Sequence, residues 1–133
     1  MLQKLNTKRG GFTLVEIMIV VAIIALLAAI AVPNFLRARK RSQATRVLED
    51  LRMIDSALDQ YAIETNKAGG TAADWVALRA YVKQGSTLYN SGGTDMFGNT
   101  FGPFTVDTVP KVPLATFSTL SDVADNTFWS PYK

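Results

Sequence analysis

The longest apolar stretch of the chain runs from Phe12 to Val32, and Thr13 and Glu16 are its two polar residues. It contains no proline or glycine, so nothing in it interrupts a helix. At about 1.5 Å per residue, a helix over these positions is roughly 30 Å long, the thickness of the hydrocarbon core of a bilayer. We therefore expect a membrane-spanning helix over residues 12–33.

Beyond Pro33 the hydrophobic pattern becomes amphipathic. Hydrophobic residues recur there at alternating steps of three and four, at Ala44, Val47, Leu51, Ile54, Leu58 and Tyr61. Such spacing places the side chains in one stripe along a helix. We expect a single helix from Phe12 to about Thr65, with a gentle bend at Pro33, because proline removes one helical hydrogen bond. The apolar stripe should pack on a folded domain formed within residues 34–133.

The rest of the chain predicts short elements of both kinds. Thr71 to Asp74 resembles a capping box, which predicts a helix from there to about Lys83. Gln84 to Gly93 has the composition of a loop. Gly98 and Asn99 are expected to supply the positive φ angles of a tight turn. The remaining expectations are a strand at Thr100–Val106, a short helix at Thr116–Val123 and a final strand at Thr127–Trp129. The predicted fold class is α+β, with a small antiparallel sheet.

Glu16 is the anomaly of the apolar stretch. A carboxylate inside a membrane helix costs about 2.5 to 3.5 kcal/mol unless it is paired or neutralised. Lipid offers no partner, which leaves a cation on another chain or a newly made α-amino group. Cleavage between Gly11 and Phe12 would create such an amine one helical turn from Glu16.

These residues carry a family resemblance. The chain has Gly10-Gly11, then Phe12-Thr13-Leu14-Val15-Glu16, then an apolar helix followed by Pro33. This arrangement resembles type IV prepilins and the pseudopilins of type II secretion systems. The resemblance implies a pilin-like fold, with the long N-terminal helix packed on the small C-terminal sheet. It also implies that residues 1–11 are a leader, which a membrane prepilin peptidase removes after Gly11 before methylating the amine of Phe12.

The resemblance further implies the function and the partners. Glu16 would pair with the Phe12 amine of a neighbouring subunit while the subunits polymerise into a helical filament. An inner-membrane assembly platform, driven by a separate ATPase, would supply the energy. The precursor would be a single-pass protein of the inner membrane, and the product an extracellular pilus or a periplasmic pseudopilus.

Composition narrows the chemistry. The chain has 133 residues, no cysteine, no histidine and a formal charge of +3. Without cysteine or histidine, the usual zinc, haem and nucleophile–imidazole sites have no ligands or bases, and we expect no enzyme. Removing residues 1–11 takes away Lys4, Lys8 and Arg9. The 14 positive residues then fall to 11 and equal the 11 acids, so the mature chain is formally neutral.

Calcium and DNA are two ligands that the polar residues of the chain could bind. Calcium is a candidate ligand because Asp122, Asp125 and Asn126, with Asp95 or Asp107, could supply oxygen atoms. Their spacing matches no EF-hand, and most acidic turn residues are solvated or cap the backbone, so we assign no metal ligand. Basic residues also line the second half of the long helix, at Arg37, Arg39, Lys40, Arg41, Arg46 and Arg52. We do not expect DNA binding, because no aromatic residues alternate with them.

Two alternatives stay open at this point. Ala29-Ile30-Ala31 fits the small-x-small cleavage site of a conventional signal peptide, which would release a secreted binding domain starting at Val32. Against this, the apolar stretch is longer than usual, contains Glu16 and runs into a basic cluster. A membrane protein that keeps residues 1–11 is the other alternative.

Overall fold

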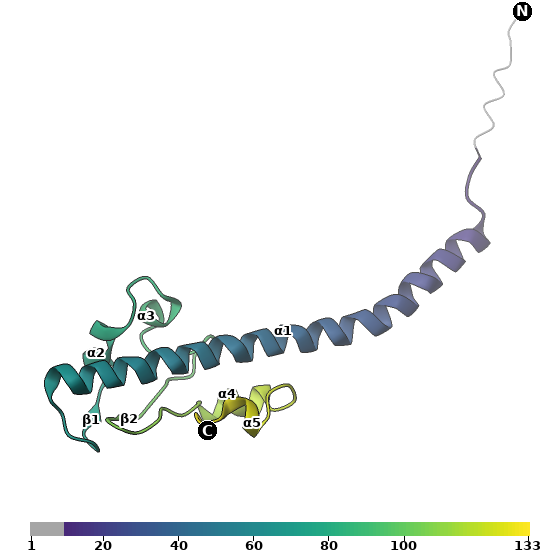
Figure 1. Cartoon of the computed structure of the whole chain (residues 1–133). Helices are drawn as coiled ribbons and strands as arrows, with labels where there is room; N and C mark the ends of the chain where they lie inside the picture. Colours follow the sequence, from purple (N-terminus) through teal and green to yellow (C-terminus); the bar gives the residue numbers. More distant parts are fainter. Residues whose placement is uncertain (1–9) are drawn as a thin grey trace, which may run out of the picture. The chain divides into compact units, whose positions relative to one another are not determined.

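The computed structural model describes residues 10–133, so residues 1–9 of the predicted leader lie outside the described part. The chain divides into two compact units, Met1–Leu36 and Arg37–Lys133. The elements are α1 (Leu14–Thr65), β1 (Ala72–Ala73), α2 (Trp75–Leu78), the 3-10 helix η1 (Arg79–Tyr81), α3 (Thr87–Ser91), β2 (Phe104–Thr105), α4 (Leu114–Leu120) and α5 (Asn126–Trp129). Figure 1 shows them along the chain.

The first unit is an apolar helical segment with an uncovered surface. Every large hydrophobic side chain from Phe12 to Leu36 is at least 47% exposed. The most apolar 18 residues of α1 have a mean hydropathy of 3.0, which is long and apolar enough to cross a membrane. Pro33 lies inside α1 and does not end it. The predicted bend at Pro33 stays a prediction.

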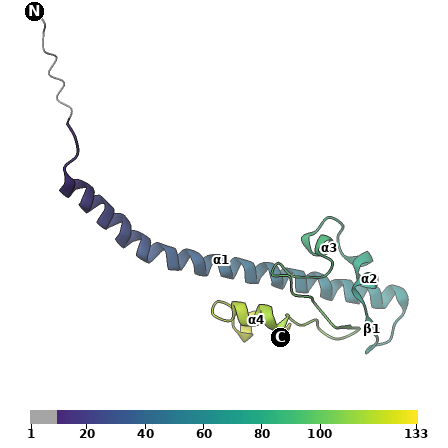
Figure 2. The ribbon, with the colours of Figure 1, turned by 180° about the vertical axis from the view of Figure 1, so that it is seen from behind.

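The second unit is built around the predicted stripe. Ala44, Val47, Leu51, Ile54 and Leu58 are buried, and Tyr61 packs against their cluster. In both Figure 1 and Figure 2, this half of α1 lies between α3 on one side and α4 on the other. The helix is therefore covered along opposite sides by short elements that come later in the chain.

The sheet is antiparallel and very small. Ala72 pairs with Thr105 and Ala73 with Phe104. Phe104 is 5% exposed and belongs to the same hydrophobic cluster as the buried face of α1. The predicted α+β architecture, a long N-terminal helix packed on a small antiparallel sheet, is thus confirmed.

Several short elements differ from the sequence predictions. Asp74, not Thr71, caps α2: its Oδ1 accepts from the amide of Ala77 at 2.8 Å, while Ala72 and Ala73 are taken up by the sheet. The segment predicted as a loop contains α3. Of the strand predicted at Thr100–Val106, only Phe104–Thr105 is a strand, and Thr100 forms an isolated bridge to Thr94.

The predicted final strand was wrong. Residues 126–129 form α5, because the Asp125 carboxylate accepts from the amide of Phe128 at 2.9 Å and so caps a helix. The predicted helix at Thr116–Val123 is present but shifted, since α4 begins at Leu114 and ends at Leu120. It ends early because the chain turns there, with the amides of Val123 and Ala124 both donating to the carbonyl of Leu120.

A buried carboxylate holds the predicted turn against α4. Asp95 is 4% exposed, and its Oδ1 accepts from the amides of Phe97 and Asn99, both at 2.9 Å. Its other oxygen accepts from the hydroxyl of Thr116 on α4. Gly98 has a φ of +82°, as predicted, but Asn99 does not adopt a positive φ. One side chain thus closes the turn and docks it on a helix.

Gly93 allows this turn to approach α2. Its φ is +85°, and a Cβ atom built on it would lie 2.6 Å from Cδ2 of Trp75. Trp75 is itself held against Phe104, with ring centroids 6.4 Å apart. A side chain at position 93 would therefore clash with the ring of Trp75.

We predict that Gly93→Ala destabilises the second unit by about 1 to 3 kcal/mol more than Gly85→Ala, because added volume in a packed site forces neighbours to move. The two glycines are matched, since Gly85 has a φ of +81° and open space around its Cβ position. Urea unfolding of the detergent-solubilised chain, followed by tryptophan fluorescence, measures the difference. Equal losses in the two variants would mean that only backbone conformation matters.

Candidate cleavage and assembly site

A reciprocal pair of hydrogen bonds forms the start of α1. The amide of Thr13 donates to Oε2 of Glu16 at 2.9 Å, and the amide of Glu16 donates to the hydroxyl of Thr13 at 3.2 Å. With Thr13 preceding the first helical residue, Glu16 is the third, which is the geometry of a capping box. The carboxylate also lies in the first turn, where the helix dipole favours negative charge.

The capping box changes the problem that Glu16 poses. The partners predicted for Glu16 were a cation on another chain or a new amine, and the structure adds the amide of Thr13. The signal was present, because Thr-x-x-Glu before an apolar run is the sequence signature of a capping box. Glu16 is therefore partly satisfied by its own chain. An ionised carboxylate has about four acceptor positions, so one hydrogen bond leaves most of them free.

The predicted cleavage junction is open. Gly10 and Gly11 are exposed, Phe12 is 84% exposed, and all three precede α1. A Cβ atom at either glycine would meet no atom within 4 Å. The junction between Gly11 and Phe12 is thus exposed and outside the helix, where another protein could reach it. The capping box begins at Thr13, one residue after Phe12, so it does not involve the junction itself.

The candidate calcium residues have other partners. Asp95 holds its own turn, Asp125 caps α5, and Asn126 accepts from the ammonium of Lys133. Asp107 lines a cavity of about 240 Å³ together with Asp55 and Asp59. Within residues 10–133, no three acidic side chains are arranged so that they could hold a metal ion.

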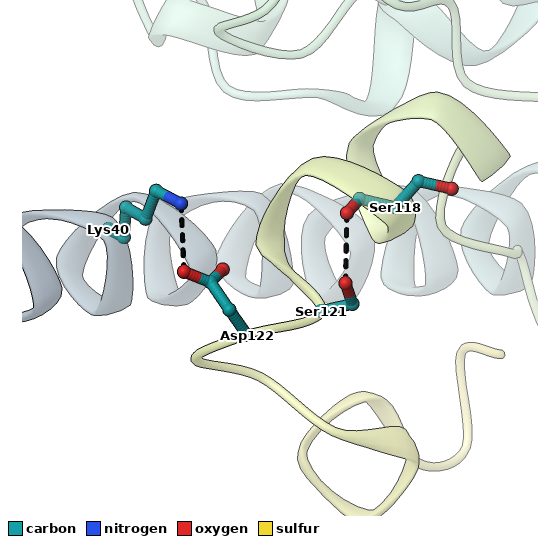
Figure 3. A network of polar contacts seen from close by, with 4 residues as sticks. All are labelled: Lys40, Ser118, Ser121 and Asp122. Carbon is teal, nitrogen blue, oxygen red and sulfur yellow. Dashed lines mark hydrogen bonds and ion pairs between the residues drawn. The ribbon is translucent and has the colours of Figure 1, made fainter.

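The basic segment at the start of the second unit makes one ion pair. The ammonium of Lys40 lies 2.8 Å from Oδ2 of Asp122, in the loop after α4 (Figure 3). Both side chains are solvent-exposed, and the nearby ammonium lowers the pKa of the Asp122 carboxyl below its usual value. In the same loop, the hydroxyl of Ser121 donates to the carbonyl of Ser118 at 2.9 Å.

Comparisons with known proteins agree with this site. Residues 6–32 match the family described as the prokaryotic N-terminal methylation motif, and this range includes the predicted cleavage junction and the whole apolar stretch. The chain is 42% identical over 71 residues to the type IV major fimbrial protein FimA of Dichelobacter nodosus, covering 53% of this chain and 46% of the relative. It is 34% identical over 71 residues, with the same coverage, to the type II secretion system core protein G of Pectobacterium carotovorum subsp. carotovorum.

The chain is therefore similar, over about half of its length, to type IV pilins and type II secretion pseudopilins. A third relative, the type IV wide pilus major component PilA4 of Thermus thermophilus, is 43% identical over 68 residues, which are 51% of this chain and 52% of that protein. The matches thus span about half the length of these relatives. No solved structure gives a significant match.

A charged cavity also lies beside α1 in the second unit. The cavity is about 410 Å³ in volume, and its lining includes Arg46, Glu49, Asp50 and Asp95. The pKa of Asp50 is raised to about 6, chiefly by burial; the Arg46 guanidinium opposes this shift, and the Glu49 and Asp95 carboxylates contribute to it. No ion pair or hydrogen bond to the side chain of Asp50 is formed by the described residues.

The raised pKa predicts how the stability of the second unit depends on pH. In the unfolded chain Asp50 has a pKa near 3.8, so the folded state binds its proton more tightly. Ionising Asp50 therefore costs stability increasingly as pH rises from about 4 to about 6, and the cost is constant above that range. Neutralising the side chain removes this cost.

We expect Asp50→Asn to raise the thermal unfolding midpoint at about pH 7.5, and to raise it much less at about pH 4, where the wild-type carboxyl is largely protonated. Thermal unfolding of both proteins across this range provides the measurement, and each low-pH pair serves as the control. An equal difference at the two ends of the range would contradict the assignment.

Proposed function

We propose that this chain is a structural subunit of a type IV pilus or a type II secretion pseudopilus, which polymerises through its apolar N-terminal helix after leader cleavage. One observation carries the proposal. The large hydrophobic side chains of the apolar stretch from Phe12 to Val32 are exposed along its whole length, and Glu16 caps the start of the helix that contains them. Such a surface requires cover from lipid or from other subunits.

The processing step follows from the same residues. We propose that prepilin peptidase removes residues 1–11 by cutting between Gly11 and Phe12, and that the new amine of Phe12 is then N-methylated. The exposure of Gly10, Gly11 and Phe12 supports this, as does the match to the methylation motif over residues 6–32. The amine remains a cation after methylation, so it can still pair with a carboxylate.

The two carboxylate oxygen atoms of Glu16 then accept from two different donors. Oε2 stays with the amide of Thr13 and fixes the side chain at the head of α1. Oε1 accepts a hydrogen bond from the charged Phe12 amine of a neighbouring subunit. A carboxylate that is already oriented by a cap loses less conformational entropy when it binds the amine. The pairing also neutralises Glu16, which favours the transfer of each subunit from lipid into the filament.

The partners follow from the proposed assembly. The main partner is the chain itself, in a helical homopolymer, and the others are prepilin peptidase and an inner-membrane assembly platform driven by a separate ATPase. We propose residues 12–33 as the membrane and polymerisation segment and residues 34–133 as the C-terminal domain. The precursor lies in the inner membrane as a single-pass protein, before becoming part of an extracellular pilus or a periplasmic pseudopilus.

The proposed role is structural and not enzymatic, which is supported by the similarity to a major fimbrial protein, a secretion-system core protein and a major pilus component. The alternative, a secreted domain released by cleavage after Ala31, is not favoured. Ala31 lies in the interior of α1, and the methylation motif extends past it to residue 32. Cleavage there would remove nearly all of the motif.

We predict that Glu16→Gln inserts into the membrane normally and enters filaments at least about tenfold less efficiently, because it loses a charge-assisted hydrogen bond. A glutamine can still accept from the amide of Thr13, so the helix start should be retained. The amounts of subunit in sheared filaments and in the membrane fraction are measured by immunoblotting.

Thr13→Val is the matched control for this test. It removes the hydroxyl that caps the amide of Glu16, which costs about 1 kcal/mol of helix stability, but it keeps the carboxylate. We expect near-normal filaments from Thr13→Val. If both variants fail equally, Glu16 acts through the cap and not through its charge.

The mass of the protein recovered from its native cells tests the processing step directly. We expect a chain that starts at Phe12 and carries one added methyl group. A start at Val32 would support the secreted alternative. A start at Met1 would leave an unprocessed membrane protein.

A further inference from the structure

A second cavity lies where the basic segment of α1 meets the loop after α4. It is about 380 Å³ in volume, and it is lined by Arg37, Ala38, Arg41, Asp122 and Val123. Arg37 and Arg41 are four residues apart on a helix, so their side chains project from the same face, one turn from each other. All five lining residues belong to the second unit.

The charges around this cavity do not cancel. Asp122 is the acidic residue of the lining, and its carboxylate is paired with Lys40 at 2.8 Å (Figure 3). Among residues 10–133, neither Arg37 nor Arg41 has an acidic partner within ion-pair distance. Two guanidinium groups are therefore left to face the cavity without a counterion. The planar fork of a guanidinium matches the oxygen atoms of a phosphate group in a bidentate manner.

The position of these arginines in the sequence indicates where the phosphate would come from. Arg37 follows Val32, the last residue of the apolar stretch, by five positions. Four cations in the five positions from Arg37 to Arg41 are unfavourable for carrying that segment across a membrane. Basic residues beside a membrane segment gain free energy by binding anionic lipid headgroups. The free energy gained by binding anionic lipid would offset the cost of carrying these cations across the membrane.

We propose that Arg37 and Arg41 hold the phosphate of an anionic phospholipid in this cavity while the subunit is anchored in the membrane. The site rests on the proposed membrane anchoring, but not on polymerisation. Lys40 does not line the cavity. It acts as a positioning residue by neutralising Asp122, which would otherwise repel the phosphate. The bound lipid keeps the start of the second unit at the headgroup layer until the subunit leaves the bilayer.

Native mass spectrometry of the full chain in detergent tests the site with three probes: phosphatidylglycerol, phosphatidylcholine and inorganic phosphate. We expect wild-type protein to prefer phosphatidylglycerol. Arg37→Gln/Arg41→Gln should weaken that binding by about tenfold to thirtyfold. Arg39→Gln/Arg46→Gln changes the net charge equally and removes no residue of the cavity, so its affinity should change by less than about threefold.

Lys40 provides a sharper test, because it influences the phosphate only through Asp122. Lys40→Gln should weaken phosphatidylglycerol binding by about fivefold. Lys40→Gln/Asp122→Asn should restore it to the wild-type level, because the ion pair is replaced by a neutral pair. A simple loss of positive charge predicts no restoration.

Several outcomes would overturn the proposal. Equal losses in the two double-arginine variants would show diffuse electrostatic attraction and no site. Binding of inorganic phosphate as strong as that of phosphatidylglycerol would exclude a lipid-specific site. Normal lipid binding by Arg37→Gln/Arg41→Gln, with defective filaments, would assign the cavity to contacts between subunits. If the chain proves soluble without detergent, the anchoring proposal fails first, and the lipid titration still reports on the cavity.

Discussion

The structure depends on one unmet requirement: the apolar half of α1 has no cover within the described part of its own chain. Burying apolar surface is worth about 25 cal/mol for each Å², so a segment of this length strongly favours lipid or a bundle of equivalent helices. These two environments are similar in polarity, and exchanging one for the other costs little. A subunit with this helix can therefore wait in a membrane and later pack into a filament.

In the proposed assembly, Glu16 gives this exchange a direction, from the membrane to the filament. In lipid the carboxylate has the amide of Thr13 as a partner, and this single hydrogen bond leaves its charge largely uncompensated. In the pairing that we propose, the Phe12 amine of a neighbouring subunit neutralises this charge. The gain is available only in the assembled state, so it favours assembly without strengthening the attachment to the membrane. A helix with a neutral residue at position 16 would be stable both in lipid and in the filament, and it would favour neither state.

The sequence was informative wherever many residues shared one requirement. The stripe from Ala44 to Leu58 and the apolar stretch before it are long, periodic or continuous patterns, and both were predicted correctly. The short C-terminal elements were not, because three or four residues such as Thr127–Trp129 fit a strand or a helix equally well. A single cap at Asp125 decided that case. The capping box of Thr13 and Glu16 has a sequence signature and was predictable, but the prediction for Glu16 considered only a cation on another chain or a new amine.

The two halves of α1 also differ in how they tolerate change. In the second unit the helix is buried in a packed hydrophobic cluster, where the size and shape of each side chain matter. In the first unit the surrounding molecules are fluid or identical copies, so apolar character matters more than shape. Arg37 to Arg41 lie between these regimes in the sequence. Their charges are useful only if something anionic meets them, and within residues 10–133 only Lys40 forms an ion pair. In the lipid site that we propose, Arg37 and Arg41 gain an anionic partner outside the chain, as the apolar stretch gains its cover from outside.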